Sequence, residues 1–273
     1  MLFPMTRSKR QTAKPRRAPR FLVLRRRWLA LAAAGLAVIA VFAAVNYPAA
    51  VSAAAASRQL PIYCVQRDQK VCSISFDAAW GADNTQKILD VLKEYGVTCT
   101  FFVVGNWADQ YPEQARAIVE SGNELENHSN AHDHFNSLSA DEIIADVNTC
   151  NDKIEALTGA RPTLIRCPFG EYDDHVISAI RSIGMEPIQW DVDSLDWKGI
   201  SADEITKRVT SKVTSGSIVL FHNAGEHTPE ALPGILDYLL SEGYQIVPIS
   251  KILLTCDYTI DHTGRQCPAK AVQ

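Results

Sequence analysis

The sequence predicts an α/β fold, a distorted (β/α)7-type barrel of parallel strands that is preceded by one transmembrane helix. From about residue 71 to residue 253, short β-rich runs alternate with amphipathic helical stretches, a pattern typical of parallel sheets. About seven such units fall short of the eight units and ~250 residues of a full barrel. A charge-free apolar run lies upstream, at residues 28–45. A doubly wound open sheet is the alternative fold.

The first 60 residues divide into three segments. Residues 1–27 form a basic tail, which we expect to be disordered and cytoplasmic. Residues 28–45 are just long enough to cross a bilayer as one helix. Residues 46–60 are rich in Ala and Ser and are expected to form a stalk. We expect residues 61–273 to form the folded domain that carries the function.

The charge pattern predicts how this chain sits in a membrane. Three arginines, Arg25 to Arg27, directly precede the apolar run and should hold its start on the cytoplasmic side. We therefore expect a single-pass cell-membrane protein with a cytoplasmic N-terminus and an extracytoplasmic domain. A signal peptide cleaved between residues 49 and 56 is the alternative. The basic segment is long for a signal peptide, which favours a retained anchor.

The domain after the tail is acidic. The tail holds ten of the 27 basic residues, which leaves 17 basic against 31 acidic residues and a net charge of about −14. Nucleic-acid binding needs a basic surface, so nucleic acid is not expected as a partner.

Seven cysteines are present, and an extracytoplasmic location would permit disulfides. Spacing predicts two short loops, Cys64 with Cys72 and Cys256 with Cys267, and the odd count leaves at least one thiol unpaired. Reduced cysteines that pack as small apolar residues are the alternative.

The strands are expected at seven short runs with β-forming composition. These are Val71–Phe76, Thr98–Val103, Glu124–Glu126, Thr163–Arg166, Glu186–Trp190, Ser217–Phe221 and Gln245–Pro248. The helices are expected at Asn84–Tyr95, Pro112–Ser121, Ala140–Leu157, Asp174–Ile183, Ala202–Thr214 and Pro229–Ser241. Ser139 and Ser201 each precede an acid-rich first turn, as helix N-caps do.

Ionisable side chains follow five of the expected strands. Functional residues of parallel barrels gather at the carboxyl ends of the strands. One such side chain alone would indicate only a turn or a structural residue. Ionisable side chains at the ends of five strands favour an active site. The residues are Asp77, His128 with His132, Arg166, Asp193 with Asp196, and His222.

These segments resemble the polysaccharide deacetylases, the NodB-homology group of carbohydrate esterase family 4. Ser75-Phe76-Asp77 is similar to the first motif of that family, and His128-Ser129-Asn130-Ala131-His132 to its metal motif. Arg166-Cys167-Pro168-Phe169-Gly170, Asp193-Ser194-Leu195-Asp196-Trp197 and Leu220-Phe221-His222 match the next three motifs in order. The segment Asp77-Ala78-Ala79-Trp80-Gly81 further resembles the membrane-anchored, sporulation-associated branch.

The resemblance implies removal of N-acetyl groups from cell-wall polysaccharide, with N-acetylglucosamine units of peptidoglycan or chitin type as substrate. His128 and His132 would hold a divalent metal, zinc first and cobalt or nickel as alternatives. Such a metal polarises the amide carbonyl and activates water. Ser129 would orient a histidine or its loop.

The remaining roles are also implied by the resemblance. Asp77 would be the general base, kept ionised by Arg166. His222 would be the general acid, oriented by Asp196. The binding and oxyanion residues would be Phe169, through its backbone N–H, and Trp197 with Leu220, as an apolar wall around the acetyl methyl group.

One position departs from the family pattern. The residue after the base is usually a second aspartate that completes the metal site, and here it is Ala78. Catalytic zinc normally has three protein ligands, so metal binding should be weakened. Water could fill the third position, or Asp83 could supply it, although Asp83 is better explained by the start of a helix. A catalytically silent, membrane-tethered glycan-binding module is the alternative function.

Overall fold

The computed structural model describes residues 35–36 and 58–269. The expected membrane span at residues 28–45 lies outside these residues, apart from Gly35 and Leu36, and so do the basic tail and most of the stalk. Within the described part of the chain, no helix is both long enough and apolar enough to cross a bilayer.

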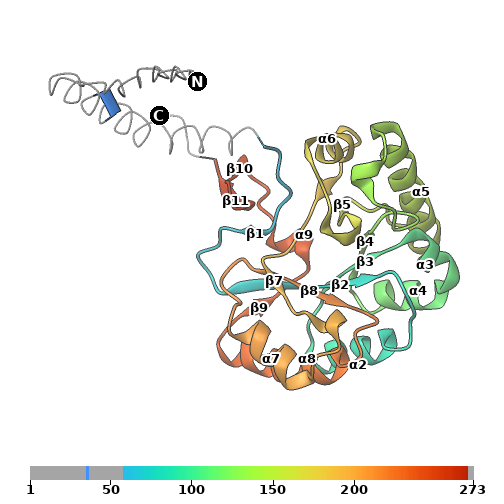
Figure 1. Ribbon diagram of the computed structural model, residues 1–273. Coiled ribbons are helices and arrows are strands. Elements are labelled where there is room, and N and C mark those ends of the chain that lie inside the picture. Colours follow the sequence, from blue (N-terminus) through green and yellow to red (C-terminus); the bar gives the residue numbers. More distant parts are fainter. Residues whose placement is uncertain (1–34, 37–57, 270–273) are drawn as a thin grey trace, which may run out of the picture. The chain divides into compact units, whose positions relative to one another are not determined.

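The domain is built on an eight-stranded sheet in which every pairing is parallel (Figure 1). The strand order is β6-β5-β4-β3-β2-β8-β7, and β9 pairs with the start of β2. The strands are β2 (Val71–Ala78), β3 (Thr100–Val103), β4 (Glu124–Asn127), β5 (Leu164–Ile165), β6 (Glu186–Pro187), β7 (Val192–Asp193), β8 (Ile218–His222) and β9 (Gln245–Ile246). The prediction of a parallel α/β sheet is confirmed.

The sheet curls towards a barrel that stays incompletely closed. Strands β6 and β7 lie at its two edges, yet only residues 188–191 separate them in the sequence. A linker of this length reaches at most about 3.6 Å per residue, so the two edges must lie near each other. Ile62 and Ile188 form an isolated parallel bridge at this opening. The result is a curled form of the expected (β/α)7-type fold.

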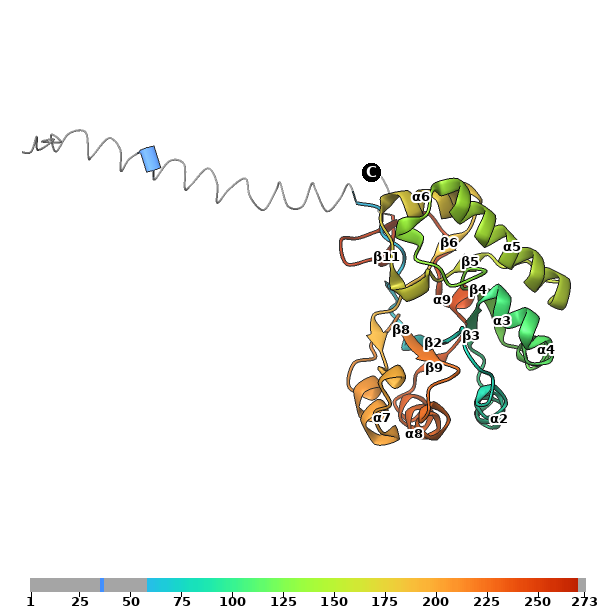
Figure 2. The same cartoon turned by 45° about the vertical axis from the view of Figure 1, so that its right-hand side comes forward.

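Helices cover the outside of the curled sheet (Figures 1 and 2). They are α2 (Thr85–Tyr95), α3 (Gly105–Gln110), α4 (Pro112–Glu120), α5 (Ala140–Thr158), α6 (Asp174–Ser182), α7 (Ala202–Thr210) and α8 (Thr228–Ser241). The short helix α9 (Ile249–Ile252) packs instead on the inner side of the sheet, in a cluster with Val71 and Phe102. Ser139 and Ser201 both form reciprocal capping boxes, as expected. The short helices α3 and α9 were not predicted, because too few residues show a helical period.

A second sheet of three strands was also missed. It pairs β1 (Cys64–Val65) with β11 (Arg265–Pro268) and β11 with β10 (Tyr258–Ile260). All seven cysteines are described, and each is a free thiol, so the two predicted disulfides are wrong. Cys64 and Cys72 are buried in different sheets, and the alternative of reduced, mostly buried cysteines holds.

The two faces of β2 position the site. The even-numbered residues from 72 to 78 pack into the apolar core that the strand shares with the outer helices. Ser73, Ser75 and Asp77 point the other way, since successive side chains of a strand alternate. The Ser75 hydroxyl donates a hydrogen bond to the backbone of Val219 on β8. Asp77 therefore lies at the inner mouth of the barrel, at the carboxyl end of a fully buried strand.

Candidate active site

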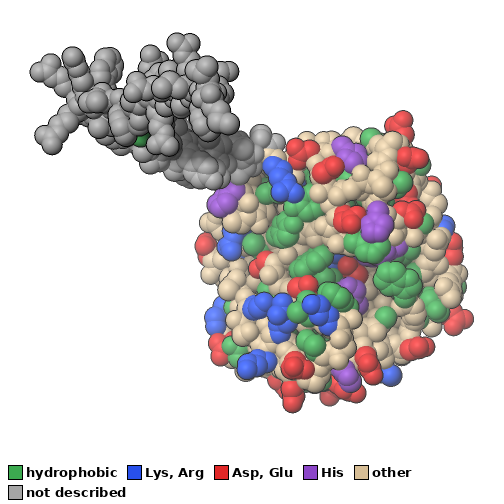
Figure 3. All heavy atoms as spheres, in the orientation of Figure 1, with side chains coloured by type: hydrophobic (Ala, Val, Ile, Leu, Met, Phe, Trp, Pro, Cys, Tyr) green, Lys and Arg blue, Asp and Glu red, His purple; other side chains and the backbone are tan. Residues whose placement is uncertain are grey.

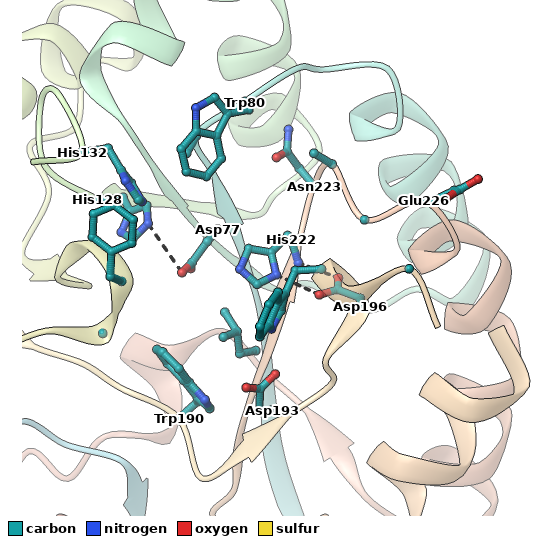
Figure 4. A pocket seen from close by; sticks show the side chains of 18 residues that line it. Asp77, Trp80, His128, His132, Trp190, Asp193, Asp196, His222, Asn223 and Glu226 are labelled. Carbon is teal, nitrogen blue, oxygen red and sulfur yellow. Dashed lines mark hydrogen bonds and ion pairs between the residues drawn. The ribbon is translucent and has the colours of Figure 1, made fainter. Parts of the chain in front are cut away.

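A pocket of about 780 Å³ opens at the carboxyl ends of the strands. Its walls come from residues at or after the ends of β2, β4, β5, β6, β7 and β8. On the face shown in Figure 3, hydrophobic, acidic and histidine side chains gather around a hollow. Figure 4 shows Asp77 near the centre of the pocket, with His128 and His132 on one side and His222 with Asp196 on the other.

Asp77 and Arg166 form a buried ion pair at the floor of the site. Arg166 Nη1 donates to Asp77 Oδ1 at 2.7 Å, and its guanidinium lies 4.3 Å from the centre of the Phe102 ring. Burial raises the pKa of Asp77, but the positive charge of Arg166, together with its hydrogen bond, outweighs it, and the net pKa is lowered. Asp77 is therefore an ionised carboxylate that can accept a proton.

His128 is held in one tautomer by the backbone. Its Nδ1 lies 2.7 Å from the carbonyl oxygen of Arg166, so Nδ1 carries the hydrogen and Nε2 keeps its lone pair. Nε2 lies 3.6 Å from Asp77 Oδ2. Burial lowers the pKa of His128 and outweighs the opposing effect of Asp77. This places a neutral imidazole lone pair beside the base.

His132 lies against His128, with 5.0 Å between the ring centres. Its backbone N–H donates to the Ser129 hydroxyl at 2.8 Å, which fixes the loop that joins the two histidines. Burial, and then the neighbouring His128, lower the pKa of His132 to about 4. Its Nδ1 is buried and has no hydrogen-bond partner among the described residues. Such an orphaned nitrogen is unusual, and a bound cation would satisfy it.

The two imidazoles lie together, and the described residues offer no third side chain that could complete a metal site with them. No group of three or more His, Cys, Asp or Glu side chains in the described ranges could hold a metal ion. Ala78 packs in the outer apolar core, on the opposite side of β2 from Asp77. Asp83 is exposed in the turn before α2 and is not part of the pocket wall. The residues thus fit the histidine part of a zinc site only.

Across the pocket, Asp196 and His222 form a second charged pair. His222 Nδ1 lies 2.8 Å from Asp196 Oδ1, while Oδ2 accepts from the His222 backbone N–H at 2.8 Å and from the Thr228 hydroxyl at 2.6 Å. Burial lowers the pKa of His222, but the hydrogen bond and charge of Asp196 outweigh it and the net pKa is raised. His222 is therefore suited to donate a proton near neutral pH.

The loop after β8 must approach Asp196 closely. A side chain at Gly225 would overlap the Thr228 hydroxyl and lie 2.7 Å from Asp196 Oδ2. A glycine at this position is thus required for the contact between Thr228 and Asp196. The sequence offered no signal for this contact, because Thr228 and Asp196 are 32 positions apart.

Backbone strain is concentrated in the loops of the site. Four described non-glycine residues have left-handed φ angles: Ser129 (69°), His132 (60°), Phe169 (58°) and Leu195 (57°). All four follow a strand of the main sheet and lie in, or next to, the motifs that form the pocket. Strain of this kind costs about 1–3 kcal/mol per residue and is typical of functional sites.

The structure brings nearly all the sequence-predicted site residues into one pocket. Besides the carboxylates of the two charged pairs and the histidines, Phe169, Trp197 and Leu220 line its walls. Arg166 is fully buried behind Asp77 and does not line the pocket, and Asp83 lies away from it. Sequence reasoning assigned no role to Trp80, Asn223 or Thr228, although Trp80 stands three residues after the predicted base.

The polysaccharide deacetylase family matches residues 65–188. The chain is 36% identical over 188 residues to a peptidoglycan-N-acetylmuramic acid deacetylase, PdaC of Bacillus subtilis, covering 69% of this chain and 40% of that protein. It is 31% identical to a peptidoglycan-N-acetylglucosamine deacetylase of Bacillus cereus, covering 67% of this chain and 68% of that one. The chain therefore belongs to the polysaccharide deacetylase family, a family of deacetylating enzymes.

A solved structure raises the question of activity. The wild-type structure of a Bacillus anthracis protein described as a CE4 family pseudoenzyme superposes with a TM-score of 0.69 at 31% identity. The match covers 77% of this chain and 73% of that one. A mutant of that protein is described as having restored enzymatic activity.

Proposed function

We propose that this protein is a metal-dependent hydrolase that removes N-acetyl groups from cell-wall polysaccharide. The observation that carries the proposal is the pairing of opposite proton-transfer groups across one pocket. Asp77 has a lowered pKa and His222 a raised pKa, so at neutral pH one is a base and the other an acid. Amide hydrolysis needs both, because water must lose a proton and the leaving amine must gain one.

The residues of the chain divide the reaction between them. Asp77 accepts the proton of the attacking water, while Arg166 keeps the carboxylate ionised and in place. The backbone N–H of Phe169 donates a hydrogen bond to the oxygen that becomes negative in the transition state. His222 then donates its proton to the nitrogen of the leaving amine. Trp197 and Leu220 exclude water around the acetyl methyl group.

A divalent metal held by His128 and His132, with zinc preferred and cobalt or nickel as alternatives, would polarise the carbonyl and lower the pKa of a nearby water. The neutral state of both imidazoles and the orphaned Nδ1 of His132 support this assignment. With no carboxylate from position 78, binding should be weaker than in a site with three protein ligands.

Release of acetate tests the proposal. The full-length protein, supplied in turn with zinc, cobalt or nickel, is incubated with peptidoglycan fragments and N-acetylglucosamine oligomers. We expect acetate with at least one metal, and none from the Asp77→Asn variant under the same conditions. Absence of acetate with every metal and substrate would refute the hydrolase.

A catalytically silent glycan-binding module is the second candidate. Ala78 favours it, and so does the similarity to a pseudoenzyme. Metal content separates the two candidates. A protein that binds glycan but takes up no zinc, cobalt or nickel would support the silent module.

For location, we propose that residues 28–45 anchor the domain on the outer face of the cell membrane. The charge-free run and the preceding arginines support this. Cell fractionation, together with protease treatment of intact cells, tests it. A soluble protein whose mature N-terminus lies near residue 55 would refute the anchor.

A further inference from the structure

Trp80 is a large apolar side chain exposed at the edge of the pocket. It is 64% exposed, whereas Asp77 and His128, deeper in the same pocket, are only 6% and 3% exposed. An exposed indole gains little from burial in the core and so adds little to folding. At this exposure, part of the indole surface remains open to solvent. Figure 4 shows Trp80 above Asp77, on the opposite side of it from Trp190.

The loop that carries Trp80 is held rigidly by the protein. The carbonyl oxygen of Gly81 accepts hydrogen bonds from Trp107 Nε1 at 2.7 Å and from Asn223 Nδ2 at 2.9 Å. Both donors are buried, and Asn223 Nδ2 also donates to the Thr85 hydroxyl. Gly81 itself adopts φ +61°, which a glycine does without strain. An exposed aromatic ring on a fixed loop is preorganised for a contact from outside.

The neighbours of Trp80 show where such a contact would be made. Its ring meets His132 edge to face at 4.7 Å, and Phe169 packs on the same imidazole at 4.4 Å. Trp80 therefore packs against His132, one of the two proposed metal histidines. Because its ring lies at the surface, it is placed to contact the part of a substrate chain outside the pocket, while the acetyl group reaches the buried Asp77.

We propose that Trp80 is a sugar-binding platform that stacks on the hexose unit next to the one being deacetylated. This inference rests on the proposed function and specifies a polymeric substrate for it. A hexose presents axial C–H groups on one face and hydroxyls around its edge, which suits a flat apolar ring beside polar groups. Trp80 would thus favour oligomers over single N-acetylated sugars.

Binding of N-acetylglucosamine and of its β-1,4-linked tetramer to the full-length protein tests this inference. EDTA is present, and the absence of acetate shows that no turnover occurs. Titration calorimetry compares wild type with Trp80→Ala, Trp80→Phe and Tyr238→Ala. Tyr238 is the matched control, because it is an exposed aromatic residue on α8 that is not part of the pocket wall.

We expect Trp80→Ala to weaken tetramer binding about five- to tenfold, the usual scale of an aromatic stacking contact. Binding of the single sugar should change less than twofold. Trp80→Phe should recover most of the loss, and Tyr238→Ala should have no effect. An unchanged thermal midpoint shows that each variant is folded.

Two results would overturn the inference, and they differ in what else they affect. If the tetramer binds Trp80→Ala as well as wild type, while wild type releases acetate from it in zinc, the platform is refuted and the proposed function stands. If wild type binds no tetramer in EDTA and releases no acetate from any substrate with zinc, cobalt or nickel, both are refuted. Equal weakening of monomer and tetramer would also count against a platform for the neighbouring unit.

Discussion

The two sides of the pocket differ in how completely the protein supplies hydrogen-bond partners for their buried polar groups. On the acid side, Asp196 accepts hydrogen bonds from the His222 ring, the His222 backbone and Thr228. On the histidine side, His132 Nδ1 is buried and finds no hydrogen-bond partner among the residues that the structure describes, and Ala78 offers no ligand atom. A buried polar group without a partner is costly, so the histidine side is the part that a bound group would stabilise.

The difference shows which parts of the reaction machinery the fold builds by itself. The acid side consists of one buried carboxylate and its donors, all placed by the β7 and β8 loops, and it needs nothing from outside. The histidine side has its base locked by Arg166, but the described part of the chain brings no group of three metal-binding side chains together there. We therefore propose that the histidine side decides whether the protein is an active hydrolase or a silent binding module.

The largest effect is expected from Arg166→Met, which breaks the pair that fixes the base. Asp77 would be left buried without its partner, and this typically costs about 3–5 kcal/mol. Urea unfolding measures the loss. The double variant Arg166→Met with Asp77→Leu should recover part of it, because the unpaired charge is then gone. A loss below about 1 kcal/mol would show that the carboxylate finds other partners.

Ala78→Asp tests whether a missing ligand explains the incomplete histidine side. In EDTA, a carboxylate placed in the outer apolar core should cost about 3 kcal/mol of folding stability. Zinc should restore stability if the side chain turns to the imidazoles, and acetate release should rise with it. Thermal unfolding with and without zinc measures this.

Ala79→Asp is the matched control, because Ala79 already lines the pocket. If zinc raises the stability of wild type as much as it raises the stability of the Ala78→Asp variant, the residue at position 78 does not limit metal binding.

Thr228→Val probes the acid side with a smaller change. It removes one donor to Asp196 while keeping the shape of the side chain, and we expect a loss of about 1–3 kcal/mol in unfolding free energy. Thr228→Ser retains the hydroxyl and should lose less. A smaller loss in Thr228→Val than in Thr228→Ser would mean that packing of the methyl group, and not the hydrogen bond, matters.

The smallest effect is on the titration of His222. Asp196→Asn removes the charge that raises the pKa of this imidazole, so the pKa should fall, and NMR titration of the ring would show it. In wild type the raised pKa stabilises the fold fully below about pH 6.5, and this contribution is lost as the pH rises through the folded-state pKa.

Asp196→Asn should therefore reduce that pH dependence and move the alkaline limit of deacetylation to lower pH. An unchanged titration would show that Asp196 does not control the charge of His222.

Local patterns predicted much of the fold and of the site. The β-rich runs, the capping boxes at Ser139 and Ser201 and the helix-ending glycines depend on neighbours a few residues away, so they can be read directly. Parallel strands bring their carboxyl ends to one edge, which is why Asp77, Arg166 and His222 could be grouped before any coordinates.

Other features depend on residues far apart in the chain. The small sheet pairs Cys64 with Arg265 in register, and no local pattern marks so distant a pairing. The predicted disulfides failed for the same reason, since spacing says nothing about which sheet buries each thiol. The hydrogen bond from Thr228 to Asp196 likewise forms only when two loops meet.

By itself the sequence determined the order of the long helices and of most strands of the main sheet, the identity of the ionisable groups and the strand ends where they lie, because these follow from side-chain period and chemistry along the chain. Only the tertiary structure decided that Ala78 faces the outer core, that His132 keeps an unpartnered nitrogen and that Trp80 stands exposed at the rim. Those outcomes depend on how the sheet curls and how its loops converge, and they arise from packing between segments that no local pattern encodes.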